Sequence, residues 1–123
     1  MRYISFALTP DQVERQIKTV TRRTGWATAK VGQVLRPARK CQGIKKGEKV
    51  QPLGTSPIRL VRIDREWMSD FLNRPDAAEE CAREGFPDMT PQEFYGFFMR
   101  THHAADADDL LVTRLEFVYE VPR

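Results

Sequence analysis

The clearest pattern in the chain is an alternation of apolar and polar positions near its C-terminal end. Residues 110–121, LLVTRLEFVYEV, place every second side chain on the same side of an extended backbone. This alternation predicts a strand with one face formed by Leu111, Thr113, Leu115, Phe117, Tyr119 and Val121. Residues 2–8, 34–41 and 58–67 also favour strands, and the last two ranges carry arginines between their apolar residues.

Helix-start signals interrupt these strands. Thr9 is a predicted N-cap and Pro10 then occupies the first helical position, so a short helix should begin there. Further helices are predicted over residues 67–73, 75–85 and 90–103.

The last two helices carry particularly clear boundary residues. Gly85 should end the helix over residues 75–85. Thr90 and Glu93 form a predicted capping box at the start of the next one, with Pro91 at its first position. Aromatic residues at helical spacing are predicted to be core residues, namely Trp67, Phe71, Phe94, Phe97 and Phe98.

The organisation of the chain indicates a single domain over residues 1–123. Residues 24–33 and 106–109 are predicted as a loop and a turn, and residues 42–57 as a Gly-, Lys- and Pro-rich loop or loose hairpin. Strands and helices do not alternate as βαβ units, which favours an α+β fold with a mostly antiparallel sheet. We expect about five to six strands curled into a small barrel, with the helices at its periphery.

One stretch, QIKTVTRRTGW at residues 16–26, fits neither an amphipathic helix nor a buried strand. Thr19 and Thr21 alternate around Val20 and favour extended chain. On a regular strand Lys18 and Thr21 would point to opposite faces. A site that uses both side chains therefore needs a bend or a strand end between them.

Charge is divided unevenly along the chain. The whole protein has a net charge of +3, but residues 15–65 hold 14 Lys and Arg against two acids, which gives +12. Residues 66–123 hold five basic and 13 acidic residues, which gives −8. If the basic half forms one surface, it should attract a polyanion such as nucleic acid, whereas basic residues scattered around the sheet would serve solubility only.

Several classes of protein lack support. No apolar run is long enough to span a membrane, and the N-terminus lacks the cleavage site of a signal peptide. Cys41 and Cys81 are expected to be unpaired reduced thiols, with a structural disulfide or a zinc site as the less favoured alternatives. The cytoplasm is the expected compartment. Adjacent His102 and His103 point about 100° apart on a helix and rarely share an ion, so we expect no metal site. We also expect no cofactor. Phosphate-binding loops and the GxSxG motif are absent.

Four stretches together resemble the ASCH domain, a branch of the PUA-like barrel superfamily. They are KTVTRR, GQVLRPAR, EGFPDMTPQEFYGFF and the closing strand VTRLEFVYEV, and the resemblance covers nearly the whole chain. The family usually has a glycine where this chain has Gln16. The resemblance implies a small β-barrel with a central cleft that binds RNA or modified nucleosides.

Some small bacterial ASCH proteins are amidohydrolases that remove the acetyl group of N4-acetylcytidine. Their catalytic lysine, threonine and glutamate fall on Lys18, Thr21 and Glu84, and a further arginine falls on Arg23. The resemblance thus implies Thr21 as nucleophile, Lys18 as base and Glu84 as its partner. The base needs a pKa well below the ordinary value of about 10.4, which burial or nearby cations can provide.

A second interpretation is a non-catalytic module that binds nucleic acid or a modified nucleoside. Arginines and lysines in the basic half would contact phosphate, and aromatic residues would stack on a base. The candidate ligand contacts are Thr19, Arg22, Arg23, Trp26, Arg36, Arg39 and Lys40, with Tyr3 and Phe6 as further stacking residues. A ribonuclease ranks last because no histidine pair is placed for RNA cleavage. A monomer is favoured.

Overall fold

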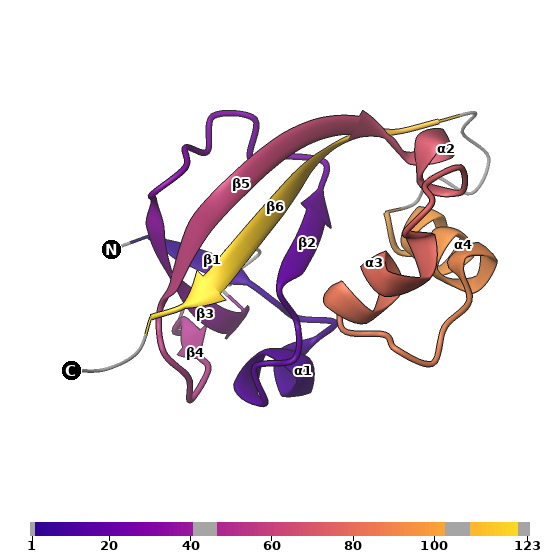
Figure 1. Ribbon diagram of the computed structural model, residues 1–123. Helices are drawn as coiled ribbons and strands as arrows, with labels where there is room; N and C mark the ends of the chain where they lie inside the picture. The colour runs from indigo at the N-terminus through magenta and orange to yellow at the C-terminus, as the bar shows by residue number, and fades with distance from the viewer. Residues whose placement is uncertain (1, 41–46, 103–108, 121–123) are drawn as a thin grey trace.

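Six strands form the sheet of the computed structural model, which describes residues 2–40, 47–102 and 109–120 (Figure 1). The strands are β1 (Tyr3–Ser5), β2 (Val20–Arg23), β3 (Val34–Lys40), β4 (Gln51–Pro52), β5 (Ile58–Trp67) and β6 (Leu111–Tyr119). Four helices accompany them: α1 (Pro10–Glu14), α2 (Met68–Phe71), α3 (Ala77–Arg83) and α4 (Pro91–Thr101). The chain therefore has a mixed α+β fold.

Strand pairing is antiparallel except between β1 and β3. The order is β1-β3-β5-β6-β2, with β4 beside β3. The two longest strands, β5 and β6, lie side by side along the whole sheet (Figure 1). Among the described residues no pairing joins β1 to β2, so the sheet is open and the predicted barrel is not confirmed.

β6 follows its predicted alternation only in part. Leu115 and Phe117 are buried in the main apolar cluster, as expected for their face. On the opposite face Val112 and Arg114 are also buried, because helices cover that side of the strand. Leu111 at the strand's start is 37% exposed.

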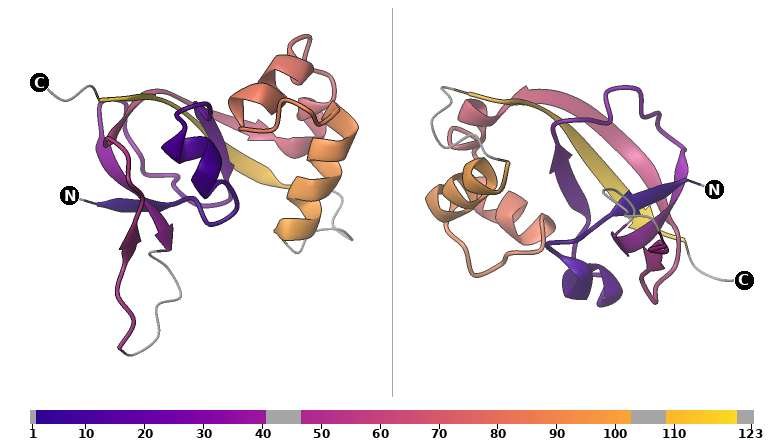
Figure 2. Two further views of the ribbon diagram at one scale, coloured as in Figure 1. Left: turned by 90° about the horizontal axis from the view of Figure 1, so that it is seen from below. Right: turned by 180° about the vertical axis from the view of Figure 1, so that it is seen from behind.

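Two apolar clusters hold the molecule together. The first lies against the sheet and is built from Ile4, Phe6, Val13, Leu35, Leu53, Ile58, Leu60, Leu115 and Phe117. The second joins the helices α2, α3 and α4, which gather beside one end of β5 and β6 (Figures 1 and 2). Its buried members are Met68, Phe71, Ala77, Cys81, Phe94, Phe98, Met99 and Val112.

The predicted helix boundaries are largely confirmed. Thr90 and Glu93 form the reciprocal capping box of α4. Gly85 follows α3 with φ of +100°, a conformation in which a side chain would be strained. Thr9 precedes α1, with Pro10 at its first position, although the Thr9 side chain makes no capping hydrogen bond.

Two predicted core residues lie outside the buried clusters, Trp67 and the half-buried Phe97 of α4. Phe71 is fully buried, but Trp67 is 50% exposed. Trp67 ends β5, where it pairs with the exposed Leu111 at the margin of the sheet. Its spacing from Phe71 was misleading because only Phe71 belongs to the helix α2.

Some expectations concern residues outside the described ranges: Cys41, His103, Val121, residues 42–46 of the predicted loop and most of the turn at 106–109. Cys81 is buried and unpaired. In the part of the chain that the structure describes, every helix is too short or too polar to cross a membrane.

Candidate functional site: an aromatic pocket beside strand β2

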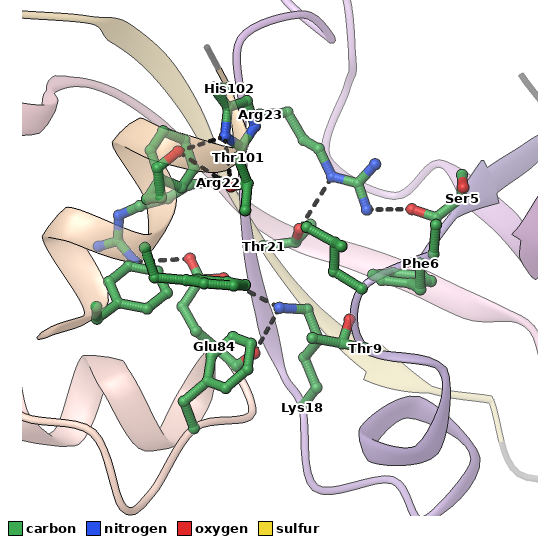
Figure 3. Close-up of a pocket in the computed structure, with 16 residues that line it drawn as sticks. Ser5, Phe6, Thr9, Lys18, Thr21, Arg22, Arg23, Glu84, Thr101 and His102 are labelled. Atoms are coloured by element: carbon green, nitrogen blue, oxygen red, sulfur yellow. Dashed lines mark hydrogen bonds and ion pairs between the residues drawn. The ribbon is translucent and has the colours of Figure 1, made fainter. Parts of the chain in front are cut away.

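A pocket of about 210 Å³ opens beside the edge strand β2 (Figure 3). Its apolar wall includes five phenylalanines, and its polar groups come from β1, Thr9, β2 and the lysine before it, and the ends of α3 and α4. The lining residues are Ser5, Phe6, Ala7, Leu8, Thr9, Lys18, Thr21, Arg22, Arg23, Glu84, Phe86, Phe94, Phe97, Phe98, Thr101 and His102. Such a mixture of aromatic surface and a few polar groups is typical of a small-molecule site.

The segment leading into β2 brings Lys18 and Thr21 to the same pocket. β2 begins only at Val20, so Lys18 lies before the strand. The alternation of side chains along β2 therefore does not apply to Lys18, and Lys18 and Thr21 both line the pocket. The turn is made at Gln16, whose φ of 58° lies in the left-handed region that favours glycine. Backbone hydrogen bonds from Lys18 N to Gln12 O (3.3 Å) and from Thr19 N to Arg83 O (2.8 Å) hold the segment. The strand end that the sequence argument required is present.

Lys18 and Glu84 form a buried pair across the pocket wall (Figure 3). Each residue is only 3% exposed. Lys18 Nζ donates to Glu84 Oε1 at 3.0 Å and to the Glu84 main-chain oxygen at 2.5 Å. Residues 66 positions apart in the chain therefore meet where the resemblance implied a catalytic pair.

The surroundings of Lys18 act on its pKa in opposite directions. Burial is the largest influence and lowers the pKa, because the charged amine loses its water. The Glu84 carboxylate raises it through its charge and its hydrogen bond, and the cations Arg23 and Arg22 lower it again. The pKa of Lys18 lies below its ordinary value as a result. The amine is thus more easily deprotonated than that of an exposed lysine.

Thr21 lies on β2 with its hydroxyl oxygen held by Arg23. Arg23 Nε donates to Thr21 Oγ1 at 2.9 Å, and Arg23 Nη2 donates to the main-chain oxygen of Ser5 at 2.5 Å (Figure 3). Arg23 therefore connects the edges of β1 and β2. A cation beside the Thr21 oxygen favours any negative charge that develops on it.

The guanidinium of Arg22 forms hydrogen bonds with three glutamate carboxylates. Its Nε, Nη2 and Nη1 donate to Glu66 Oε1 (2.5 Å), Glu80 Oε1 (2.5 Å) and Glu84 Oε2 (2.9 Å). Its side chain is fully buried. Arg22 borders the pocket, but these contacts fit a structural role better than the phosphate contact considered from the sequence.

Glu80 lies at the centre of the same charge network. It is fully buried on α3 and accepts hydrogen bonds from Arg22, Arg83 and Arg114. Burial by itself raises the pKa of Glu80, but the hydrogen bonds of Arg114 and Arg83 and the nearby Arg22 outweigh it. The pKa of Glu80 therefore lies well below its ordinary value, and the carboxylate stays ionised.

Other predicted contact residues lie away from this pocket. Thr19 is not among its lining residues, and Trp26 packs against the first apolar cluster with the Arg2 guanidinium 4.0 Å above its ring. The three basic residues of β3 do not line the pocket: Arg36 is exposed, Arg39 lies 3.8 Å from Glu14, and Lys40 pairs with Glu48 at 3.1 Å. Tyr3 belongs to β1 and pairs with Arg36 in the sheet.

Several pocket residues were not anticipated as such. Phe94, Phe97 and Phe98 were expected in the core, and all three line the pocket, although only Phe94 and Phe98 belong to the second apolar cluster. Phe86 was not singled out at all. His102 stacks on Phe98 with ring centroids 3.9 Å apart. Glu80 was also missed, although two glutamates four positions apart on one helix, Glu80 and Glu84, could have signalled a shared charged face.

The described residues contain no group of three or more His, Cys, Asp or Glu placed to hold a metal ion. Comparison of the chain with protein-family models, with curated proteins and with solved structures finds no significant match.

Proposed function

We propose that this chain is an ASCH-type member of the PUA-like superfamily that hydrolyses the amide of an N4-acylated cytidine. The observation that carries the proposal is the meeting of Lys18, Thr21 and Glu84 at one aromatic pocket. The family pattern names these three positions from sequence, and they come from segments far apart in the chain. The left-handed turn at Gln16, where the family has glycine, further supports the assignment.

The pocket suits a single nucleoside. Its volume of about 210 Å³ lies below the range of roughly 300–1,000 Å³ common for larger ligands. Phenylalanine rings such as Phe86 and Phe97 offer surfaces for a pyrimidine, and a base stacked on an aromatic ring gains roughly 1–3 kcal/mol. The acyl group would then point toward Thr21 and Lys18.

The first chemical step transfers the acyl group to the protein. Thr21 Oγ1 attacks the carbonyl carbon, and its proton passes to the neutral amine of Lys18, directly or through one water. The bond between the carbonyl carbon and N4 breaks, and Lys18 returns the proton to N4. Cytidine leaves, and the acyl group remains as an ester on Thr21. Arg23, already bonded to the Thr21 oxygen, stabilises the charge on that oxygen as it attacks.

The second step restores the protein. A water molecule attacks the ester carbon and gives a proton to Lys18, and the C–O bond to Thr21 breaks. Lys18 returns the proton to the Thr21 oxygen, and the carboxylic acid is released. Glu84 holds the amine in place throughout through the contact of 3.0 Å between Lys18 Nζ and Glu84 Oε1.

The same contacts support a second candidate, a module that binds a modified nucleoside or nucleic acid without chemistry. Lys18 donates twice to Glu84, an arrangement that also suits a permanently charged lysine. The pocket would then recognise its ligand through Lys18, Arg23 and the aromatic wall. Binding to duplex nucleic acid would weaken with salt, by a log–log slope near −0.9 for each neutralised phosphate.

The two candidates are separated by incubating the protein with N4-acetylcytidine and measuring cytidine by chromatography. We expect turnover that falls by about 100-fold or more in Lys18→Ala, Thr21→Ala and Glu84→Gln. Matched exposed residues serve as controls, and Lys30→Ala, Thr28→Ala and Glu79→Gln should retain full activity. Absence of turnover in the unaltered protein, together with salt-dependent binding of RNA, would assign it to the binding class.

A further inference from the structure

The Glu84 carboxylate is shared between two cations, one on each oxygen. Lys18 Nζ lies 3.0 Å from Oε1, and Arg22 Nη1 lies 2.9 Å from Oε2. Figure 3 shows Glu84 between the two side chains. A carboxylate held at both oxygens cannot rotate freely, so the position of the Lys18 amine depends on Arg22 as well as on Glu84.

Arg22 is itself fixed from three directions. Glu66 on β5, Glu80 on α3 and Glu84 after α3 each accept from a different nitrogen of its guanidinium. Only arginine presents donors in such a planar fork, and lysine has a single nitrogen to offer. Three carboxylates, one from β5 and two from α3 and its C-terminal end, therefore determine one orientation of Arg22.

Behind Arg22 the network continues through Glu80. Arg114 on β6 donates to both oxygens of Glu80 at 2.7 and 3.0 Å, and Arg83 adds a contact of 2.9 Å. These ion pairs tie α3 to β2 and β6, and α3 is the helix that leads directly into Glu84. Buried charges persist only when partners surround them, so the network fixes the end of α3 relative to β2.

We infer that Arg22 is a positioning residue of this site, which holds Glu84 in place and keeps the Lys18 amine available as a base. Only the role of Lys18 as a base rests on the proposed function; the positioning of Glu84 by Arg22 does not. Arg22 needs no contact with the reacting atoms for this role, because it acts through the far oxygen of Glu84.

The electrostatic consequence concerns how strongly Glu84 acts on Lys18. The charged groups that act on the Lys18 amine are Glu84 after α3 and Arg22 and Arg23 on β2. His102, beyond α4, is a further titratable residue that lines the pocket. Arg22 competes for the negative charge of Glu84 and also repels a charged amine. Removal of Arg22 would leave Glu84 to stabilise the ammonium form of Lys18 alone, which raises its pKa.

The test is a titration of Lys18 in the intact protein, followed by the NMR signal of its ε-carbon and assigned by its loss in Lys18→Ala. In Arg22→Gln the midpoint should rise by about one pH unit or more. The acid limb of the kcat/KM profile for N4-acetylcytidine should move upward by the same amount. Arg83→Gln is the matched control, because Arg83 contacts Glu80 and Asp76 but not Glu84, and its midpoint should match that of the unaltered protein.

A second variant decides the matter if Arg22→Gln does not fold. Glu66→Gln removes one carboxylate from Arg22 without touching Glu84, which leaves more of the Arg22 charge to act on Glu84 and Lys18. The Lys18 midpoint should then fall. An unchanged midpoint in folded Arg22→Gln, or an unchanged or raised midpoint in Glu66→Gln, would overturn the inference. Because the titration needs no substrate, its result stands even if the unaltered protein fails to release cytidine.

Discussion

The two faces of the β2–β6 pair are buried in different ways. On one face Leu115 and Phe117 join an apolar cluster against the sheet. On the other face Arg22 and Arg114, neighbours in the strand pairing, are buried against Glu80 of α3. The apolar face gains stability from apolar area removed from water and tolerates exchanges that conserve side-chain volume. The charged face is stable only when every partner is present.

The candidate site lies at the edge strand β2, between these two faces: Thr21 pairs with Leu115 on the apolar face, and Arg22 contacts Glu84 on the charged face. A cluster of apolar side chains cannot hold an amine or a carboxylate in one orientation. A network of paired charges can, because each bond has a direction, and the network ends on Glu84 beside Lys18. We therefore expect substitutions on the two faces to differ in how their effect on the free energy of unfolding depends on pH.

The largest effect on stability is expected from Glu80→Ala. It leaves Arg22 and Arg114 buried without their common partner, and removing one member of a buried ion network costs about 3–5 kcal/mol. Urea unfolding measures the change, and Glu79→Ala on the exposed side of α3 is the control. A loss below about 1 kcal/mol would mean that the charged face contributes little.

Glu80 should also account for part of the decrease in the free energy of unfolding at acidic pH. Because the pKa of Glu80 is depressed in the folded protein, its stabilising contribution is present above the unfolded value of about 4.3. That contribution is lost as the pH falls below this value toward the folded pKa. The free energy of unfolding of Glu80→Ala should therefore decline less steeply in acid than that of the unaltered protein.

On the apolar face, Leu60→Ala should cost about 2–5 kcal/mol. The loss comes from a cavity and from lost burial, so it should be the same at pH 4 and pH 7. The pH dependence thus separates the two faces even where their losses are similar. A loss that changes with pH as strongly as that of Glu80→Ala would contradict the distinction.

A smaller loss, about 1–2 kcal/mol, is expected from Gly85→Ala. The φ of +100° strains any side chain, and the added carbon would lie 3.0 Å from Gln12 Cγ. Since Gly85 follows Glu84, turnover of N4-acetylcytidine should also fall. Gly25→Ala is the control, because its added carbon meets nothing within 4 Å and its φ is not positive.

The smallest effect is expected from Tyr119→Phe, about 1 kcal/mol at neutral pH. The change removes the hydrogen bond of 2.6 Å from the Tyr119 hydroxyl to the main-chain oxygen of Lys18. Burial raises the pKa of Tyr119 above its ordinary value of about 10. Its contribution is therefore present below pH 10 and lost as the pH rises further. Unfolding measured at pH 8 and pH 11 should show the difference between the two proteins shrink.

Local chemistry made much of the fold predictable. The capping box of Thr90 and Glu93 and the stop at Gly85 depend on residues a few positions apart, and both are present. β5 occupies residues 58–67, as its pattern indicated. The sequence also indicated that a site using both Lys18 and Thr21 needs a bend or a strand end between them, because these positions point to opposite faces of a regular strand. The structure has this strand end at Val20.

Contacts between distant segments could not be predicted in this way. Arg22 looks like a ligand-binding arginine in the sequence, and its three carboxylates lie 44 to 62 positions away. Burial on both faces of β6 depends on where α2, α3 and α4 pack, which no alternation in β6 reveals. The basic residues of the first half lie on several strands, and Arg36, Arg39 and Lys40 do not line the pocket, so the charge summed along the sequence does not describe the charge at this pocket.

Release of cytidine from N4-acetylcytidine by the unaltered protein, compared with Thr21→Ala, tests the central claim most directly. We predict turnover in the unaltered protein and a loss of about 100-fold or more in the variant, because the attacking oxygen has been removed. Absence of turnover in the unaltered protein, or equal turnover in Thr21→Ala, would contradict the proposed chemistry.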